Sequence, residues 1–202
     1  MKDYTKGKIN SDDIYKGWIK IPVPSKDLKT LTASKIFPLV PQDEELFPNE
    51  YIILESENNP ENNKLFRFIG GKECISVEPI TIMNTFKAKN IQQLMALDLL
   101  MDDKIQFITL LGPAGTGKTF LTILAGLYKV ALTKTYRKLL ITRPVVALGA
   151  DLGFLPGDMQ EKLHYWMQPV HDNLEFISSQ LMRGNQLGLT AEAPRQNGTN
   201  DH

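Results

Sequence analysis

The sequence has little of several features that mark specialised classes of protein. Its 202 residues include one cysteine, Cys74, which excludes an internal disulfide and fits a reducing compartment. A lone cysteine without a flanking motif is more typical of a small core residue than of a nucleophile. Lys and Arg together number 23, as do Asp and Glu, so the formal net charge is zero. No overall charge excess therefore demands nucleic acid or an anionic membrane as partner, although a local basic patch stays compatible with it.

Long apolar runs are also missing. The most apolar stretch, residues 105–111, is far shorter than the roughly 20 residues that cross a bilayer. The first residues, MKDYTKGKINSDD, are polar and lack the apolar core of a secretory signal. We therefore expect no membrane partner and a cytoplasmic location. The composition, 42% hydrophobic and 23% charged, is that of an ordinary globular protein.

Residues 1–80 combine scattered prolines with short apolar runs, which disfavours long helices. The runs with strand character are residues 51–54, 65–69 and 75–77. Polar or glycine-rich segments that read as turns separate them at residues 57–63 and 70–71. The simplest prediction is a small, β-rich N-terminal region built as an antiparallel meander.

Residues 86–180 have a different pattern, in which helices and strands alternate. The predicted strands are residues 105–111 and 138–142, both continuous apolar runs as in a buried parallel sheet. Three helices are predicted. The first is capped by Asn90 and ends near Met101, the second spans residues 118–132, and the third begins after Asp158, another capping residue. This order predicts a right-handed βαβ unit and an α/β domain. Residues 181–202 are rich in Gly, Asn and Gln and are predicted to form a disordered tail.

One motif between the first of these strands and the helix after it carries specific chemistry. It reads Gly112, Pro113, Ala114, Gly115, Thr116, Gly117, Lys118, Thr119, which matches the phosphate-binding pattern G-x-x-x-x-G-K-[ST]. The glycines permit backbone angles that let successive N–H groups curl around a phosphate, and the helix that follows adds its own N-terminal donors. Lys118 would reach the β- and γ-phosphates, and the Thr119 hydroxyl would ligate Mg²⁺. The sequence therefore predicts binding of ATP or another nucleoside triphosphate with Mg²⁺, and Lys118 and Thr119 are the candidate catalytic residues.

Four stretches from Asn90 onward are characteristic beyond the loop itself: NIQQLMALDLL, LLGPAGTGKTFLTILAGL, ITRPVVALGADLGFLPGDMQEKL and WMQPVHDNLEFI. In these stretches the chain resembles the PhoH-like family of P-loop ATPases. The resemblance is greatest to the type in which a PIN ribonuclease domain precedes the ATPase, and INSDDIYKGW is similar to the connector after that domain, which is itself not recognised here. The resemblance implies a partial RecA/helicase-like parallel sheet, ATP hydrolysis coupled to work on RNA, and assembly as a homo-oligomer.

The resemblance also implies roles for two residues outside the loop. Gln93, in the N-x-x-Q pattern, is placed like the adenine-reading glutamine of related helicases, since a Gln amide can pair with the donor and acceptor edge of adenine; the alternative is a solvated helix residue. Arg143 would contact the phosphate backbone of RNA, or instead bridge a carboxylate such as Asp151 or Asp158. His164 and His171 lack a third ligand, so no metal site is expected there.

The sequence departs from the family where hydrolysis needs a second carboxylate. In the family this residue belongs to a D-E-A-Q-N stretch well after LGFLPGD, and no apolar run ending in Asp or Glu follows Ile177 here. Asp98, Asp102 and Asp103 precede the loop, which is the wrong position for that role. Three functions stay open: an RNA-dependent ATPase, a nucleotide-binding remnant without turnover, and a P-loop phosphotransferase, for which no acceptor-binding feature is recognised.

Overall fold

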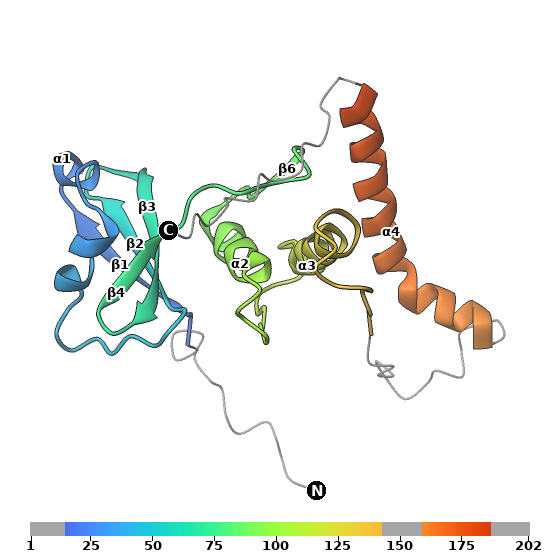
Figure 1. Ribbon diagram of the computed structural model, residues 1–202, viewed down its shortest axis with the longest axis horizontal. Helices are drawn as coiled ribbons and strands as arrows, with labels where there is room; N and C mark the ends of the chain where they lie inside the picture. Colours follow the sequence, from blue (N-terminus) through green and yellow to red (C-terminus); the bar gives the residue numbers. More distant parts are fainter. Residues whose placement is uncertain (1–14, 143–158, 187–202) are drawn as a thin grey trace, which may run out of the picture. The chain divides into compact units, whose positions relative to one another are not determined.

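The computed structural model describes residues 15–142 and 159–186. The chain divides into two compact units, Met1–Glu78 and Pro79–His202, and each is described separately below (Figure 1). The first is built around a sheet and the second mainly from helices, so the described chain is a mixed α/β protein.

The first unit is a four-stranded sheet in the order β1-β2-β3-β4. Its strands are β1 (Trp18–Val23), β2 (Tyr51–Ser56), β3 (Asn59–Gly70) and β4 (Glu73–Ser76). Strand β1 is parallel to β2, whereas the β2–β3 and β3–β4 pairs are antiparallel. The connection from β1 to β2 carries the short helices α1 (Ser25–Leu28), η2 (Ala33–Lys35) and η3 (Phe37–Leu39). A parallel pair requires such a crossover, because its two strands start at the same end of the sheet.

The core of this unit joins the sheet to these short helices. Ile52 and Leu54, two residues apart on β2, are fully buried on one face, as the two-residue period of a strand requires. The cluster comprises Ile21, Val23, Leu28, Ile36, Ile52, Leu54, Phe66, Phe68 and Cys74. Cys74 is thus a buried core residue, as its isolation in the sequence predicts.

The predicted antiparallel meander is confirmed in β2, β3 and β4. The turn predicted at Gly70 and Gly71 lies one residue further on, at Gly71 and Lys72, both with positive φ, because Gly70 still pairs with Glu73 as the last residue of β3. Strand β1 was not predicted. It contains Pro22, which breaks an otherwise strand-like run, and its pairing with β2 is set by tertiary contacts that local pattern does not reveal.

The predicted turn at residues 57–63 is narrower in the structure. Only Glu57 and Asn58 form the turn, and β3 begins at Asn59. The register shifts there in a bulge: Ser56 pairs with Asn59, whereas the preceding Glu55 pairs with Asn63. Asparagine side-chain amides form hydrogen bonds with backbone groups of the bulge. The Asn63 side chain donates to the carbonyls of Pro60 (3.2 Å) and Glu61 (3.3 Å), and the Asn59 side chain accepts from the Glu61 N–H (3.1 Å).

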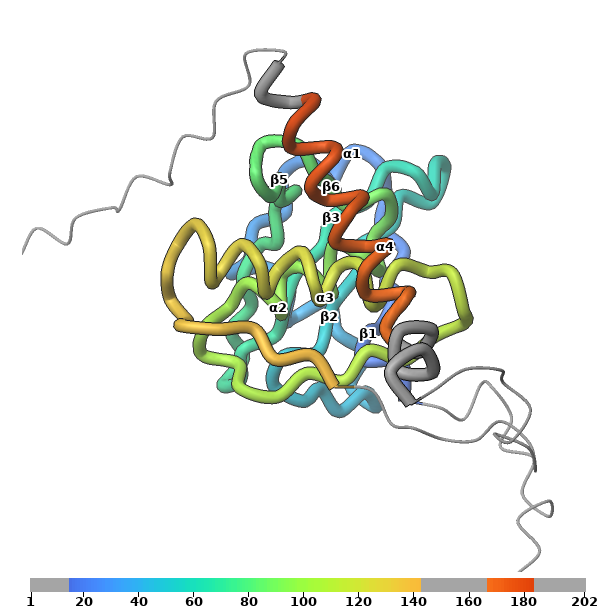
Figure 2. The backbone as a smooth tube through the Cα atoms, turned by 90° about the vertical axis from the view of Figure 1, so that its right-hand side faces the viewer, coloured from blue at the N-terminus to red at the C-terminus, as the bar shows by residue number. Residues whose placement is uncertain are grey.

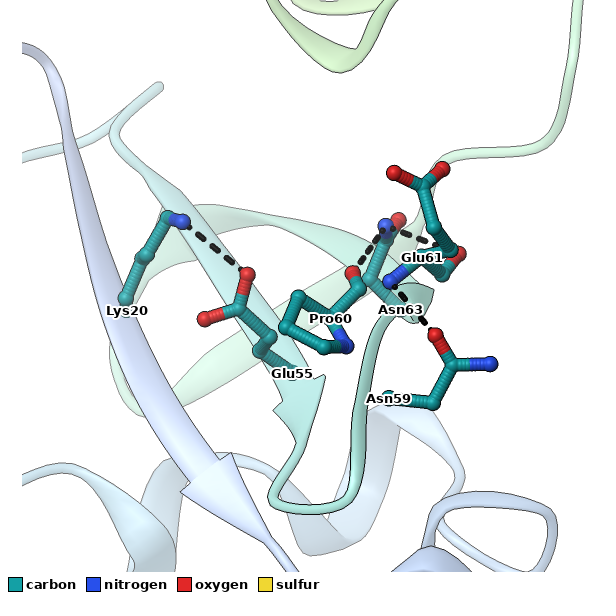
Figure 3. A network of polar contacts seen from close by, with 6 residues as sticks. All are labelled: Lys20, Glu55, Asn59, Pro60, Glu61 and Asn63. Carbon is teal, nitrogen blue, oxygen red and sulfur yellow. Dashed lines mark hydrogen bonds and ion pairs between the residues drawn. The ribbon is translucent and has the colours of Figure 1, made fainter.

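Figure 3 shows this bulge beside an ion pair between neighbouring strands, in which Lys20 Nζ lies 3.0 Å from Glu55 Oε1. Both side chains are partly exposed, so the pair contributes little to stability, about 1 kcal/mol at most. Its position across β1 and β2 agrees with the parallel pairing of those strands.

The second unit is mainly helical. It begins with a small hairpin, β5 (Thr81–Ile82) and β6 (Phe86–Lys87), and continues with α2 (Ile91–Met101), α3 (Lys118–Leu127), the π-helical turn η4 (Tyr128–Leu132) and α4 (Met159–Gln186). Helix α3 contacts both α2 and α4, and Figure 2 traces the three helices along the chain. The core comprises Ile82, Phe86, Leu97, Leu121, Ile123, Leu124, Val170 and Ile177.

A series of aromatic contacts runs from this core to the surface and links three segments of the second unit. The Phe120 ring lies 5.7 Å from that of Phe86 and 5.8 Å from that of Phe176, both in edge-on geometry. Edge-on aromatic pairs contribute about 0.5–1.5 kcal/mol beyond the area they bury. Phe120 thus ties the first turn of α3 to the β5–β6 hairpin and to α4.

The helix predictions hold in most respects. Asn90 caps α2, since its side-chain oxygen accepts the Gln93 N–H at 2.9 Å. The helix predicted over residues 118–132 is present, with its last turn π-helical. A helix follows Asp158 as expected, although Asp158 itself lies outside the described residues. Pro169 lies inside α4, where its missing N–H removes one helical hydrogen bond, and the axis of α4 changes direction along its length in Figure 1.

Two predictions about the second unit need correction. Residues 181–186 are the last turns of α4, with Leu181 packed against the core, and do not belong to a disordered tail; residues 187–202 lie outside the described part. The strands predicted at residues 105–111 and 138–142 are also wrong. Neither run pairs with a strand among the described residues, and Phe107, Leu111 and Leu140 are 86%, 78% and 74% exposed.

The reason for the missing strands is physical. An apolar run becomes a strand only when a neighbour accepts and donates its backbone hydrogen bonds. The predicted parallel sheet of a P-loop domain is therefore not formed by the described residues, in which β1 and β2 are the one parallel pair. Across the same residues, no helix has both the length and the apolar character of a membrane span.

Helix α3 offers a test of this packing. Leu124 is fully buried, whereas Leu111 is 78% exposed. We expect Leu124→Ala to lower the free energy of unfolding by about 2–5 kcal/mol, because it leaves a cavity in the core. The same truncation at Leu111 should cost less than about 0.5 kcal/mol. Urea titration followed by circular dichroism measures both variants. Equal losses would show that Leu111 is packed in a sheet, contrary to the structure.

Cys74 offers a test of the first unit. Burial raises the pKa of its thiol above the ordinary value, so at a given pH less of the reactive thiolate is present. Iodoacetamide at pH 8 should therefore alkylate Cys74 at least about tenfold more slowly in the folded chain than in urea. Because the pKa is raised, the alkylation rate of the folded chain should begin to increase at a higher pH than that of the unfolded chain. Equal rates in the two states would contradict the buried position.

Candidate nucleotide-binding site

The loop predicted to bind phosphate lies directly before α3. Its backbone takes up conformations that other residues avoid: φ is 153° at Gly112, 78° at Gly115 and 91° at Gly117. Gly117 occupies the left-handed region immediately ahead of the first helical residue, Lys118. Side chains at positions with such φ values are strained, so the spacing of the glycines in the motif matches the bends of the chain.

The Lys118 ammonium group bonds back to the first residues of the loop. Its Nζ donates to the carbonyl oxygens of Gly112 (2.8 Å) and Pro113 (2.7 Å), and Thr116 Oγ1 is a third, longer contact at 3.4 Å. An ammonium group has three donors. Two of them donate to carbonyls at the start of the loop. These bonds hold the positive charge in a fixed position beside the backbone that would bind a phosphate.

The two threonines of the motif have different surroundings. Thr116 lies within the loop and donates its hydroxyl to the Pro113 carbonyl at 3.0 Å, which closes the turn. Thr119 lies in the first turn of α3 and is exposed. A hydroxyl that is to ligate a metal ion arriving from solvent must be accessible in this way. Pro113, Ala114 and Gly115 are exposed as well, so the outer side of the loop is open to solvent.

Helix α3 fixes this loop to the core. The Leu121 N–H donates to the Gly117 carbonyl at 2.9 Å, the first bond of the helix, and Leu121, Ile123 and Leu124 are buried. The first N–H groups of a helix have no partner within it and carry a partial positive charge. The buried face of α3 therefore holds a set of donors and Lys118 together at the loop.

Gln93 reaches the same loop from α2. Its side-chain Nε2 donates to the Thr116 carbonyl at 3.2 Å, and its Oε1 accepts the Lys89 N–H at 2.9 Å. The N-x-x-Q spacing thus places Gln93 at the loop, 23 residues away in sequence. The contact with Thr116 was not predicted, because spacing along a helix gives no distance to a separate segment.

The opposite end of α3 has an ion pair that the sequence did not reveal. Lys129, 9% exposed in the turn η4, pairs with Asp103 Oδ1 at 2.6 Å, and its ammonium lies 5.6 Å from the centre of the Tyr136 ring. A cation near the C-terminal end of a helix is favoured by the helix dipole. Asp103, which sequence position excluded from a catalytic role, thus anchors the far end of α3 and not the loop end.

Other candidate residues fall outside this geometry. Arg143, Asp151 and Asp158 lie outside the described residues, as does the side chain of His164. Between residues 15 and 142 and in the described part of α4, no group of three or more His, Cys, Asp or Glu side chains is arranged to hold a metal ion.

Comparison with known proteins places this site in a family. The family described as PhoH-like protein matches residues 85–187, just over half of the chain. Protein PhoH2 of Bacillus subtilis is 52% identical over 91 residues, 45% of this chain and 21% of the relative. Protein PhoH2 of Mycolicibacterium smegmatis is 44% identical over 94 residues, 46% of this chain and 22% of the relative. The PhoH-like protein of Synechocystis is 39% identical over 92 residues, 45% of this chain and 27% of the relative.

The chain thus spans about a fifth to a quarter of the length of these relatives. No solved structure matches it significantly. The matched residues include the whole of the loop, Lys118 and Gln93. Because the family match covers more than half of the chain, the chain belongs to the PhoH-like protein family.

Proposed function

We propose that the loop from Gly112 to Thr119 binds the triphosphate of ATP together with Mg²⁺. The observation that carries this proposal is the arrangement at the start of α3. Three glycines with positive φ bend the chain, and the Lys118 ammonium is braced by the carbonyls of Gly112 and Pro113. Backbone N–H groups, a helix N-terminus and a fixed ammonium are the donors that a phosphate group needs.

The residues fit Mg–ATP in distinct roles. Lys118 would contact the β- and γ-phosphates; its ammonium now makes two short bonds to loop carbonyls and one longer contact, to Thr116 Oγ1. The exposed Thr119 hydroxyl would ligate Mg²⁺, which prefers oxygen ligands. The bound ion would draw charge from the phosphates during hydrolysis.

We further propose that ATP turnover by this protein serves work on RNA. Membership of the PhoH-like family supports this reading, and Arg143, in the segment ITRPVV, is the candidate contact to RNA phosphate. A second candidate function is nucleotide binding without turnover. The loop from Gly112 to Thr119 is compatible with it, because binding of the phosphates does not by itself supply the residue that orients the attacking water.

Lys118→Ala tests the binding proposal. We expect the affinity for Mg–ATP to fall at least about tenfold, or about 1.4 kcal/mol, because a charge-assisted contact to phosphate is lost. Lys104→Ala is the matched control: Lys104 is exposed, lies outside the loop, and its own hydrogen bond to Asp102 is made by the backbone N–H. Isothermal titration calorimetry measures both. Equal affinity of the wild type and Lys118→Ala would remove the basis of the proposed site.

Turnover separates the two candidate functions. If the chain is an RNA-dependent ATPase, single-stranded RNA should raise the rate of phosphate release by the wild type. Arg143→Ala should then lose most of this stimulation while its affinity for Mg–ATP stays within about twofold, since a backbone contact positions RNA and not nucleotide. ATP binding without phosphate release, with or without RNA, would assign the chain as a nucleotide-binding module instead.

A further inference from the structure

Both ends of the Gln93 side-chain amide are hydrogen-bonded, and one of them is bonded to the loop. Its oxygen is held by the Lys89 N–H at 2.9 Å, and its NH₂ group donates to the Thr116 carbonyl at 3.2 Å. Its backbone is fixed as well, because the Gln93 N–H donates to the capping side chain of Asn90 at 2.9 Å. An amide held in this way is a rigid arm that reaches from the start of α2 to the loop.

The bond to Thr116 sets the direction of one peptide group. In a trans peptide the carbonyl and the N–H of the next residue point in opposite directions, and no cis peptide is present among the described residues. While Gln93 holds the Thr116 carbonyl, the Gly117 N–H must point away from Gln93. The Gly117 N–H then lies on the side of this peptide opposite Gln93, where it can serve as a donor to a phosphate.

Close packing at Gly117 supports the same assignment. A Cβ built on Gly117 would lie 3.3 Å from Gln93 Nε2, and φ at this residue is 91°. The amide therefore packs directly on the turn that starts α3 as well as bonding to it. Gly117 meets two requirements here, a left-handed backbone and space for the Gln93 amide.

The network continues from this peptide to the ammonium group. Thr116 also donates its hydroxyl to the Pro113 carbonyl at 3.0 Å, and the same carbonyl accepts from Lys118 Nζ at 2.7 Å. Gln93, Thr116, Pro113 and Lys118 thus form one continuous chain of hydrogen bonds. A change at Gln93 is transmitted to the phosphate-binding groups through Thr116.

We propose that Gln93 is a positioning residue of the loop, whose amide orients the Thr116–Gly117 peptide so that its N–H can bind phosphate. This inference rests on the proposed function of the loop and changes the role predicted for Gln93 from its sequence. A residue that reads adenine affects only ligands that have a base. A residue that orients the loop affects every ligand that has the phosphates.

Inorganic tripolyphosphate separates these roles, because it has the phosphate chain of ATP without base or sugar. We expect Gln93→Ala to weaken the binding of Mg–tripolyphosphate and of Mg–ATP by the same factor, about fivefold, the effect of one lost hydrogen bond. Gln93→Glu keeps the acceptor for Lys89 but loses the donor to Thr116, so it should weaken both ligands at least as much. Calorimetry on the full chain gives the affinities.

Gln92→Ala is the matched control, since Gln92 is the neighbouring glutamine on α2 and is exposed; it should bind both ligands like the wild type. Gln93→Ala should fold, because alanine favours helix and the cap uses only the backbone of residue 93. Weaker binding of ATP alone would make Gln93 a base reader and overturn the inference, as would unchanged binding of both ligands. Failure of the wild type to bind either ligand would overturn the proposed function itself.

Discussion

The arrangement of this site depends on the buried face of α3. Leu121, Ile123 and Leu124 fix the helix in the core of the second unit, and the loop begins where that helix begins. A glycine-rich loop by itself has high conformational entropy, and ordering each residue costs about 1–2 kcal/mol. Burial of a leucine side chain returns about 1.5–3 kcal/mol. The helix therefore supplies the rigidity that the loop sequence lacks.

Both ends of α3 are secured by polar contacts of different kinds. At its start, Gln93 and Lys118 donate to the loop carbonyls of Thr116, Gly112 and Pro113, so these acceptors have partners before any ligand arrives. Beyond its last turn, the mostly buried Lys129 pairs with the half-exposed Asp103, and removing Asp103 would leave the Lys129 charge mostly buried without this partner. The apolar face sets where the helix lies, and these contacts fix its ends.

The apolar runs on either side of the loop and α3 illustrate a limit on strand formation. Residues 105–111 and 138–142 have the composition of buried strands, yet the described residues give them no neighbour, and Phe107, Leu111 and Leu140 are exposed. Backbone groups of an isolated extended segment bond to water as readily as to a strand. In the first unit the same physics has the opposite result, because β2 has partners on both sides and four consecutive buried residues.

The sequence alone determined the features that depend on local pattern. The spacing of Gly112, Gly115, Gly117 and Lys118 determined the bends of the loop and the start of α3, because only glycine adopts such angles without strain. Asn90 determined the start of α2 through its side chain, and the isolation of Cys74 indicated a core residue.

Tertiary structure decided the features that depend on partners distant in sequence. These are the parallel pairing of β1 with β2, the lack of a partner strand for residues 105–111 within 15–142 and 159–186, and the bond from Gln93 to Thr116. A residue's own conformational preference is readable from its type and neighbours. A hydrogen bond across 23 residues exists only once the chain has folded and both groups have been brought together.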